Sequence, residues 1–251
     1  MSIVPRFDVL TVHPDMVDGP LSCSIIGRAR NAGRVGVHVH DIREYGIGRH
    51  KTVDDTPYGG GPGMVMRVDV VANCINAVPK RNRCRVLLTS PTGRRFDQQF
   101  AQQLMSFEQV IIVCGHYEGI DARIEDLVDE SVSLGDFVMT GGEIAAVAVV
   151  DAVARLHPGV LGNDASANDE SFADGLLEYP QFTRPKIWND EEVPAVLLSG
   201  HHRNIEKWRT DQKIARTRSL RPDLFAAWQG RNSAEVVDIR DEDVDVLPDV
   251  E

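Results

Sequence analysis

The sequence predicts an α/β fold with a mostly parallel sheet. Short segments rich in Val, Ile and Leu alternate with segments whose apolar residues have helical spacing, which is the order of elements in α/β domains. Several strand segments are apolar at consecutive positions, as in strands that are covered on both faces. The chain has 251 residues, of which 42% are hydrophobic, so one large or two modest domains can form a core.

The expected strands are short, and the expected helices lie between them. Strands are predicted at residues 7–12, 35–40, 86–88 and 110–113, and helices at residues 22–32, 68–78 and 97–105. Ligands of such sheets lie beyond the carboxyl ends of the strands. Two segments follow strands and are therefore predicted to be ligand loops: T-S-P-T-G at residues 89–93 and C-G-H-Y-E-G at residues 114–119.

A third glycine-bearing segment, S-L-G-D-F-V-M-T-G-G-E at residues 133–143, leads into an apolar helical stretch. Glycines let backbone amides approach a ligand closely, or let the chain turn where a side chain would clash. The phosphate-binding pattern G-x-x-x-x-G-K-[ST] is absent from the sequence, and G-x-G-x-x-G is missing at the strand ends. The segments therefore predict a pocket for a nucleoside-like ligand that is not held by its phosphates.

The helical stretch at residues 142–156 is apolar nearly all round, which predicts a buried or interface helix. Asp151 and Arg155 are four residues apart and share a face of it. Arg155 is therefore either half of a salt bridge or a group that stabilises a developing negative charge. Upstream, residues 50–64 predict an irregular loop that is either a structural turn or, given its length, a binding loop.

The C-terminal third begins with a polar segment of small residues at 162–174, which predicts a linker between two domains. The second domain is expected from about residue 175, with a helix at residues 202–218. Residues after 232 are expected to be disordered because they are strongly acidic. No internal repeat is present.

The net charge of −11 is unevenly distributed. Residues 234–251 hold eight acids and one Arg, a net charge of −7, whereas residues 184–221 hold nine basic and five acidic residues, a net charge of +4. The basic segment is either a phosphate-contacting surface or a solvated helix face.

The cysteines and the apolar runs predict a cytoplasmic protein that is reduced and does not enter a membrane. The four cysteines have no metal-binding or redox spacing, and the adjacent His201 and His202 also lack partner spacing for a metal, so no metal site is predicted. His116 alone is more typical of a structural histidine than of a base or a ligand. The longest apolar run, residues 144–150, is too short to span a bilayer.

Taken together, the motifs resemble one family closely. In order along the chain they are V-D-D-T-P-Y-G-G-G-P-G-M, T-S-P-T-G, C-G-H-Y-E-G-I-D-x-R, S-L-G-D-F-V-M-T-G-G-E, D-A-V-A-R-L-H-P-G-V-L-G, E-S-F-A-D-G-L-L-E-Y-P-Q-F-T-R-P and L-L-S-G-H-H. The set is similar to the bacterial tRNA (guanine-N1)-methyltransferases of the SPOUT superfamily. The likeness covers about residues 7–224, nearly the whole chain.

The resemblance implies a parallel sheet with a deep trefoil knot and a small, mainly helical C-terminal domain. It implies a knotted catalytic domain at residues 1–161 and a tRNA-binding domain at 175–232, joined by the linker at 162–174, which is expected to be mobile. The acidic tail at 233–251, expected to be disordered from its composition, has no counterpart in the family. It further implies S-adenosylmethionine as cofactor, a homodimer with active sites between subunits, and the tRNA anticodon arm as partner. The implied product is 1-methylguanosine at position 37.

Carried over motif by motif, the resemblance implies the residues of the cofactor pocket. Backbone groups would bind the adenine edge, and apolar side chains would enclose its ring. The implied residues are Thr89, Ser90, Pro91, Gly93, Gly115, Tyr117, Glu118, Gly119, Ser133, Leu134, Gly135, Asp136, Phe137, Val138, Met139, Gly141 and Gly142.

The implied catalytic groups are Arg155, at the position of the family arginine that contacts guanine O6, and a linker acid. The family base is an Asp directly before S-F; here Glu170 stands in that position and Asp169 precedes it. Glu170 is the expected base and Asp169 its substitute. His116 and Phe137 replace Arg and Tyr of many relatives. The expected RNA contacts are Asp54, Asp55, Arg184, His201, Arg209 and Arg216.

Two other functions compete with this prediction. One is a SPOUT methyltransferase that modifies another RNA position; the segment E-S-F-A-D-G and the later T-R-P favour position 37 over it. The other is a non-catalytic RNA-binding module that senses an adenine nucleotide; Arg155 and the linker acid argue against it. A magnesium ion, at the site or on the RNA alone, is left open by the sequence.

Overall fold

The computed structural model describes residues 3–162 and 170–241, with side chains described as far as residue 232. The chain divides into two compact units, Met1–Asp164 and Ala165–Glu251. The division falls inside the predicted linker. Each unit is described by itself below.

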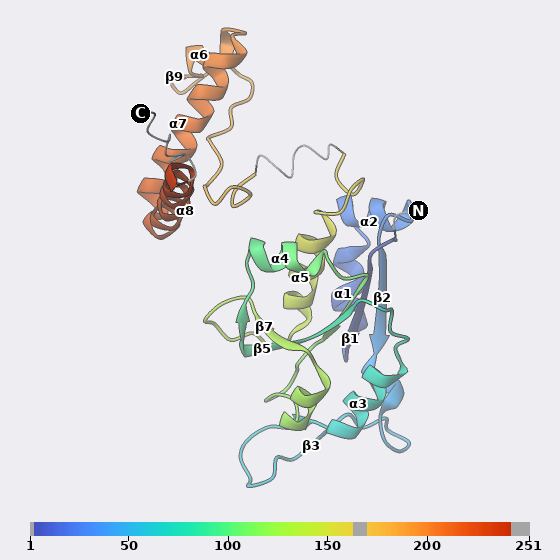
Figure 1. The fold of residues 1–251 in the computed structure, drawn as a ribbon. Helices are drawn as coiled ribbons and strands as arrows, with labels where there is room; N and C mark the ends of the chain where they lie inside the picture. The colour runs from blue at the N-terminus through green and yellow to red at the C-terminus, as the bar shows by residue number, and fades with distance from the viewer. Residues whose placement is uncertain (1–2, 163–169, 242–251) are drawn as a thin grey trace, which may run out of the picture. The chain divides into compact units, whose positions relative to one another are not determined.

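A five-stranded parallel sheet forms the centre of the first unit (Figure 1). Its strand order is β2-β1-β6-β5-β7, and every neighbouring pair is parallel. The strands are β1 (Arg6–Thr11), β2 (Gly36–Asp41), β5 (Cys84–Arg95), β6 (Gln109–Val113) and β7 (Glu130–Ser133). The α/β class and the parallel sheet predicted from the sequence are confirmed.

Helices cover both faces of the sheet, so the unit has three layers and two apolar clusters. One face packs against α1 (Pro14–Leu21), α2 (Ser24–Asn31), α4 (Gln98–Leu104) and α5 (Glu143–Ala154). The other packs against α3 (Val68–Ala77) and the short 3₁₀ helices η1 (Ile42–Tyr45) and η2 (Ala122–Leu127). Because β6 is central, it is buried at every position, which explains its apolar sequence.

A buried carboxylate stands in the middle of this sheet. Asp8 on β1 is fully buried and accepts hydrogen bonds from Arg6 (2.7 and 2.8 Å), Gln109 (2.7 Å) and the His40 ring (2.8 Å). Burial alone would raise the pKa of Asp8, but the hydrogen bonds from His40, Arg6 and Gln109 outweigh burial and hold that pKa well below its usual range. The group is therefore ionised and tied to two neighbouring strands.

Strand β5 differs from the prediction. It was expected to end at residue 88, but its pairing with β7 resumes at Arg94, after a register shift that begins at Thr89. The segment T-S-P-T-G is thus a bulge inside a long strand rather than a loop at its end. Pro91 has no N–H to give to the ladder, so an irregularity there is expected.

Several elements of the first unit were not predicted, among them helix α1 and strand β7. Helix α1 contains Gly19 and Pro20, which read as helix breakers, but Pro14 occupies its first position and Pro20 only its last turn. Strand β7 has the polar sequence E-S-V-S and lies at the sheet edge, so its pattern carries little signal. A small antiparallel pair, β3 (Asp54–Asp55) and β4 (Val65–Met66), brackets the glycine-rich loop.

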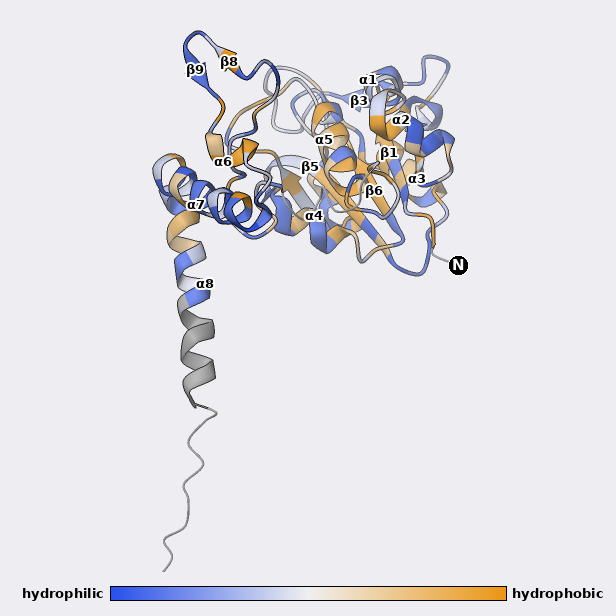
Figure 2. Ribbon diagram, turned by 90° about the horizontal axis from the view of Figure 1, so that it is seen from above, coloured by the Kyte–Doolittle hydropathy of each residue, from blue (hydrophilic) through white to orange (hydrophobic). Residues whose placement is uncertain are grey.

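The second unit is mainly helical, as predicted. It contains a hairpin of β8 (Ile187–Trp188) and β9 (Glu191–Glu192), a short α6 (Ala195–Leu198), and the long helices α7 (His202–Leu220) and α8 (Pro222–Asp241). Figure 2 shows α7 as largely hydrophilic, in contrast to the hydrophobic strands β1 and β6.

Helix α8 is a departure from the sequence-based expectation. Disorder was predicted from residue 233, whereas the backbone is helical as far as Asp241. Pro222 suits the first helical position, and the Ala, Glu and Arg residues that follow favour helix. The prediction of disorder was based on the acidic charge of this segment and did not consider its helix propensity.

Candidate active site

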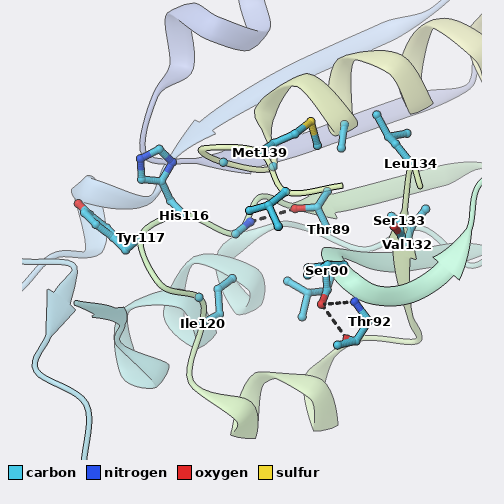
Figure 3. A pocket seen from close by; sticks show the side chains of 18 of the residues that line it. Thr89, Ser90, Thr92, His116, Tyr117, Ile120, Val132, Ser133, Leu134 and Met139 are labelled. Atoms are coloured by element: carbon cyan, nitrogen blue, oxygen red, sulfur yellow. Dashed lines mark hydrogen bonds between the residues drawn. The ribbon is translucent and has the colours of Figure 1, made fainter. Parts of the chain in front are cut away.

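A cavity of about 390 Å³ opens beyond the carboxyl ends of β6 and β7 and beside the bulge of β5 (Figure 3). Its wall comes from three chain segments, 88–92, 115–122 and 132–142 (without residue 136), with Glu125 of η2 and Ala145 of α5 added. Such a place is where parallel sheets bind ligands, and the volume is that of a small-molecule site. The three segments are those that the sequence predicted to be ligand loops.

Thr89 joins two of these segments. Its hydroxyl donates to the Val113 carbonyl (3.2 Å) and accepts from the Gly115 amide (3.0 Å). The Gly142 amide in turn donates to the Gly115 carbonyl (2.7 Å). A Cβ on Gly142 would overlap the Thr89 hydroxyl, so only glycine permits this approach. The segments thus form one connected wall.

The glycine-rich loop between β3 and β4 also joins the wall. The Glu118 amide donates to the Met64 carbonyl (3.0 Å), and the Met66 amide donates to the Gly119 carbonyl (2.9 Å). At Gly63 an added Cβ would overlap the Glu118 side chain. The loop at residues 50–64 therefore contacts the cavity segment, in keeping with a binding loop rather than a remote turn.

The charges of the wall select against phosphate. Among the described residues that line the cavity there is no Lys or Arg, whereas Glu118, Asp121 and Glu125 are present. The Arg123 guanidinium donates to Asp121 (2.7 and 2.8 Å) and holds the pKa of that carboxyl at about 2. Because Asp121 is paired with Arg123, the other two acids, Glu118 and Glu125, are the groups that favour a positively charged ligand.

A buried polar group lies behind the wall. Glu143 at the start of α5 is fully buried, and one carboxylate oxygen accepts from the Thr11 hydroxyl (2.8 Å). Its other oxygen lies 3.6 Å from Nδ1 of His116, whose ring packs against His13 with centroids 4.6 Å apart. His116 lines the cavity, although its isolation in the sequence is more typical of a structural histidine.

Most residues implied for the cofactor pocket do line the cavity: Thr89, Ser90, Pro91, Gly115, Tyr117, Glu118, Gly119, Ser133, Leu134, Gly135, Phe137, Val138, Met139, Gly141 and Gly142. Gly93 and Asp136 do not. A Cβ on Gly93 would overlap the backbone of β7, and Asp136 is exposed on the turn beside Phe137. Lining residues that sequence reasoning missed include Thr92, Ile120 and Thr140, which stand inside the motifs already singled out.

The expected catalytic groups belong to different units. Arg155 is half-buried at the C-terminal cap of α5 in the first unit and is not among the residues that line the cavity. Glu170 is half-buried in the second unit, where its carbonyl accepts from the Ala173 amide (3.2 Å). Asp169 lies outside the described residues.

The expected RNA contacts are mostly at the surface. Arg184, His201 and Arg216 are exposed in the second unit, whereas Arg209 is half-buried, with its guanidinium 4.8 Å from the ring centre of Tyr179. In the first unit the strand β3 holds Asp54 and Asp55, and Asp55 pairs with Arg67 at 2.7 Å.

Within residues 3–162 and 170–241, no group of three or more His, Cys, Asp or Glu side chains is arranged to hold a metal ion. Of the helices that the structure describes, none is both long enough and apolar enough to cross a membrane.

Comparison with known proteins identifies similar sequences along most of the chain. Residues 5–227 match the model of the family described as tRNA (Guanine-1)-methyltransferase TrmD. A relative from Geobacter sulfurreducens is 56% identical over 222 residues, which are 88% of this chain and 91% of the relative. One from Lachnospira eligens is 50% identical over 232 residues, covering 91% and 98% of the two chains. Both relatives are named tRNA (guanine-N(1)-)-methyltransferase.

Proposed function

The chain belongs to the tRNA (guanine-1)-methyltransferase family, and from this premise we propose that it methylates N1 of the guanine at position 37 of tRNA, with S-adenosylmethionine as donor. The observation that carries the proposal is the cavity at the strand ends, with three acidic side chains and, among its described lining residues, no Lys or Arg. A nucleotide phosphate fits such a wall poorly, whereas a nucleoside with a cationic sulfonium and ammonium fits it well.

The residues present are suited to this cofactor. Backbone groups of the segments around Gly115 and Gly135 would bind the adenine edge, and apolar side chains such as Ile120, Leu134 and Met139 would enclose the ring. Glu118 and Glu125 would offset the positive charge. The cofactor supplies a methyl group that its sulfonium already activates. The protein's task is alignment and proton removal.

Glu170 would take the proton from guanine N1. This nitrogen is a poor nucleophile while it keeps its proton, and a carboxylate within hydrogen-bond distance can accept the proton as the methyl group is transferred. Removing a carboxylate from water raises its pKa and makes it a better base near neutral pH. Glu170 has the family position directly before S-F, and Asp169 is the substitute.

Arg155 would stabilise the negative charge that spreads to guanine O6 as the proton leaves. A planar guanidinium suits this role because it stays protonated and donates in a fixed geometry. Its place at the end of α5, outside the cavity wall, separates it from cofactor binding.

A homodimer with active sites between subunits is part of the proposal. Its support is the exposure of three apolar side chains in residues 137–144: Phe137 (56% exposed), Val138 (91%) and Ile144 (56%). Large exposed apolar side chains are typical of interaction surfaces when they lie together. The SPOUT knot and a cytoplasmic location belong to the same proposal and rest on the family. The basic helix α7 would contact the anticodon arm.

Transfer of a labelled methyl group to unmodified tRNA tests the proposal. We expect 1-methylguanosine in digests of tRNA with G37 and no product when G37 is replaced by adenine. The control is the same reaction with ribosomal RNA. A product at another tRNA position, or in ribosomal RNA, would point to the competing SPOUT specificity, and absence of any transfer would favour a non-catalytic module.

A further inference from the structure

Residues 170–179, which follow the expected base, form a compact hydrogen-bonded loop rather than an extended tether. The Phe172 amide donates to the Leu176 carbonyl (2.7 Å), and the Glu178 amide donates to the Ser171 hydroxyl (3.0 Å). Phe172 takes a left-handed φ of 74°, a strained conformation for a bulky residue, so the loop has a defined shape. Glu170 stands at the start of this loop.

Two side chains of α7 hold the loop. Thr217 is buried; its hydroxyl accepts from the Leu177 amide (2.8 Å) and donates to the Lys213 carbonyl (2.7 Å). One turn away, the Lys213 ammonium donates to Asp174 at 2.6 Å. The second carboxylate oxygen of Asp174 accepts from the Leu176 amide (3.1 Å) inside the loop. Asp174 thus joins the loop's own turn to the helix.

The burial of Lys213 is unusual. Only 8% of this residue is exposed, although lysine is among the residues least often buried. Elsewhere on α7, Lys207 forms a pair of similar length with Asp211 (2.7 Å), and those side chains are 76% and 57% exposed. A buried charge is stable only when it is paired and hydrogen-bonded, so Lys213 depends on its partners in a way that Lys207 does not.

We propose that Lys213 is a positioning residue for methyl transfer: through Asp174 it fixes the loop that carries Glu170 to helix α7. The proposal rests on the proposed function, because only there is Glu170 the base. A general base acts only within hydrogen-bond reach of its proton, and a misplacement of about 1 Å can lower the rate on the order of 10²-fold. The base would then be set in place by the same helix that meets the RNA.

A competing role for Lys213 is direct contact with an RNA phosphate. The ion pair with Asp174 and the small exposure both oppose it. The two roles differ in their salt dependence. Loss of a phosphate contact lowers the slope of log Kd against log salt concentration by about one, whereas loss of a positioning residue leaves that slope unchanged.

The experiment compares Lys213→Met, Lys213→Arg and Asp174→Asn in the full-length chain, with Lys207→Met as matched control on the same helix. Single-turnover methyl transfer is measured with saturating S-adenosylmethionine and tRNA, and tRNA Kd is measured across salt concentrations. We expect Lys213→Met and Asp174→Asn to lower the transfer rate by about tenfold or more. The tRNA Kd of these two variants should stay within about twofold of the wild-type value, and Lys213→Arg should recover much of the rate. At saturating tRNA, Lys207→Met should keep the wild-type transfer rate.

Several results would overturn the proposal. A wild-type rate in Lys213→Met would do so, as would weaker tRNA binding with a reduced salt slope. If thermal unfolding shows that Lys213→Met does not fold, the transfer rate of Lys213→Arg is compared with that of Lys207→Met instead. A Lys213→Arg rate far below the Lys207→Met rate would then contradict the proposal. Glu170→Gln is measured in parallel: its full activity would refute the base and Lys213 together, whereas its inactivity with an unaffected Lys213→Met refutes Lys213 alone.

Discussion

Among single side chains, Arg155 offers the clearest separation of catalysis from cofactor binding, because it caps α5 and does not line the cavity. We predict that Arg155→Ala lowers kcat on the order of 10²-fold, since charge on O6 loses its partner, while S-adenosylmethionine affinity stays near wild type. Calorimetry and steady-state kinetics measure the two effects. Arg155→Lys keeps the charge and loses the planar fork, so its kcat should lie between those of wild type and Arg155→Ala. An unchanged kcat in Arg155→Ala would remove this residue from the mechanism.

The buried carboxylate of Asp8 should make the unfolding free energy depend on pH. Its pKa is lowered in the folded state, so its stabilisation is present above the unfolded pKa of about 3.9 and is lost as pH falls toward the folded value. Wild type should therefore lose unfolding free energy more steeply below about pH 4 than Asp8→Asn. At pH 7 this variant should be destabilised by about 3–5 kcal/mol, because it breaks a buried charge network.

Urea unfolding at several pH values measures the effect of Asp8. The matched control is Asp18→Asn, which breaks a pair with Arg30 whose carboxylate side chain is 53% exposed and should cost less than about 1 kcal/mol. Equal slopes against pH in wild type and Asp8→Asn would contradict the account of this carboxylate.

For single residues, the sequence predicted the cavity residues that lie within a motif. It did not predict contacts between residues that are far apart in the chain. Glycine and hydroxyl residues of the cavity wall were identified because they stand inside recognisable segments. The contacts of Asp8 with His40 and Gln109, and of Glu143 with Thr11, were not foreseen because the partners come from different strands and helices. No local pattern encodes such pairs.

At the scale of elements, the strands and helices with long apolar patterns were predictable, and those with mixed patterns were not. Strand β6 and helix α5 are buried on most sides and read clearly in the sequence. Strand β7 is short and polar, so it was missed. The bulge at Thr89 was interpreted as a loop because the segment follows the apolar residues 86–88, although the strand resumes beyond it.

Gly142, at the start of α5, lies so close to Thr89 of the cavity wall that a larger residue should disturb the cavity. An alanine Cβ there would overlap the Thr89 hydroxyl, which bridges β6 and the following segment, so Gly142→Ala should weaken S-adenosylmethionine binding about tenfold or more. Titration calorimetry measures the affinity, and circular dichroism checks that the fold is kept. Gly19→Ala on α1 is the control, because its added Cβ meets nothing within 4 Å. Normal affinity in Gly142→Ala would mean that the wall adjusts without cost.

For the whole molecule, the sequence predicted two units and a division between residues 162 and 174, because that segment is polar and composed of small residues. Composition could not predict the proposed dimer or the proposed knot, which rest on family resemblance. These properties depend on how chain segments thread and on which surfaces meet, and neither leaves a periodic signal.

A mixing experiment tests whether the active site is shared between subunits. Glu170→Gln and Arg155→Ala should each be inactive as homodimers. If the base and the arginine at one site come from different subunits, a mixed dimer contains one intact site, and random mixing should restore about a quarter of the wild-type sites. Co-expression with two affinity tags, followed by methyl-transfer assays, measures this. Absence of recovery in purified mixed dimers would place both groups in one subunit.

The proposed mechanism requires a carboxylate at residue 170 to remove the guanine proton. Single-turnover methyl transfer by Glu170→Gln, with Asp169→Asn as its neighbour control, tests it most directly. We predict that Glu170→Gln lowers the rate by about 10²–10⁴-fold with unchanged S-adenosylmethionine affinity, and that Asp169→Asn changes the rate little. A near wild-type rate in Glu170→Gln together with an inactive Asp169→Asn would contradict the claim and assign the base to the preceding residue.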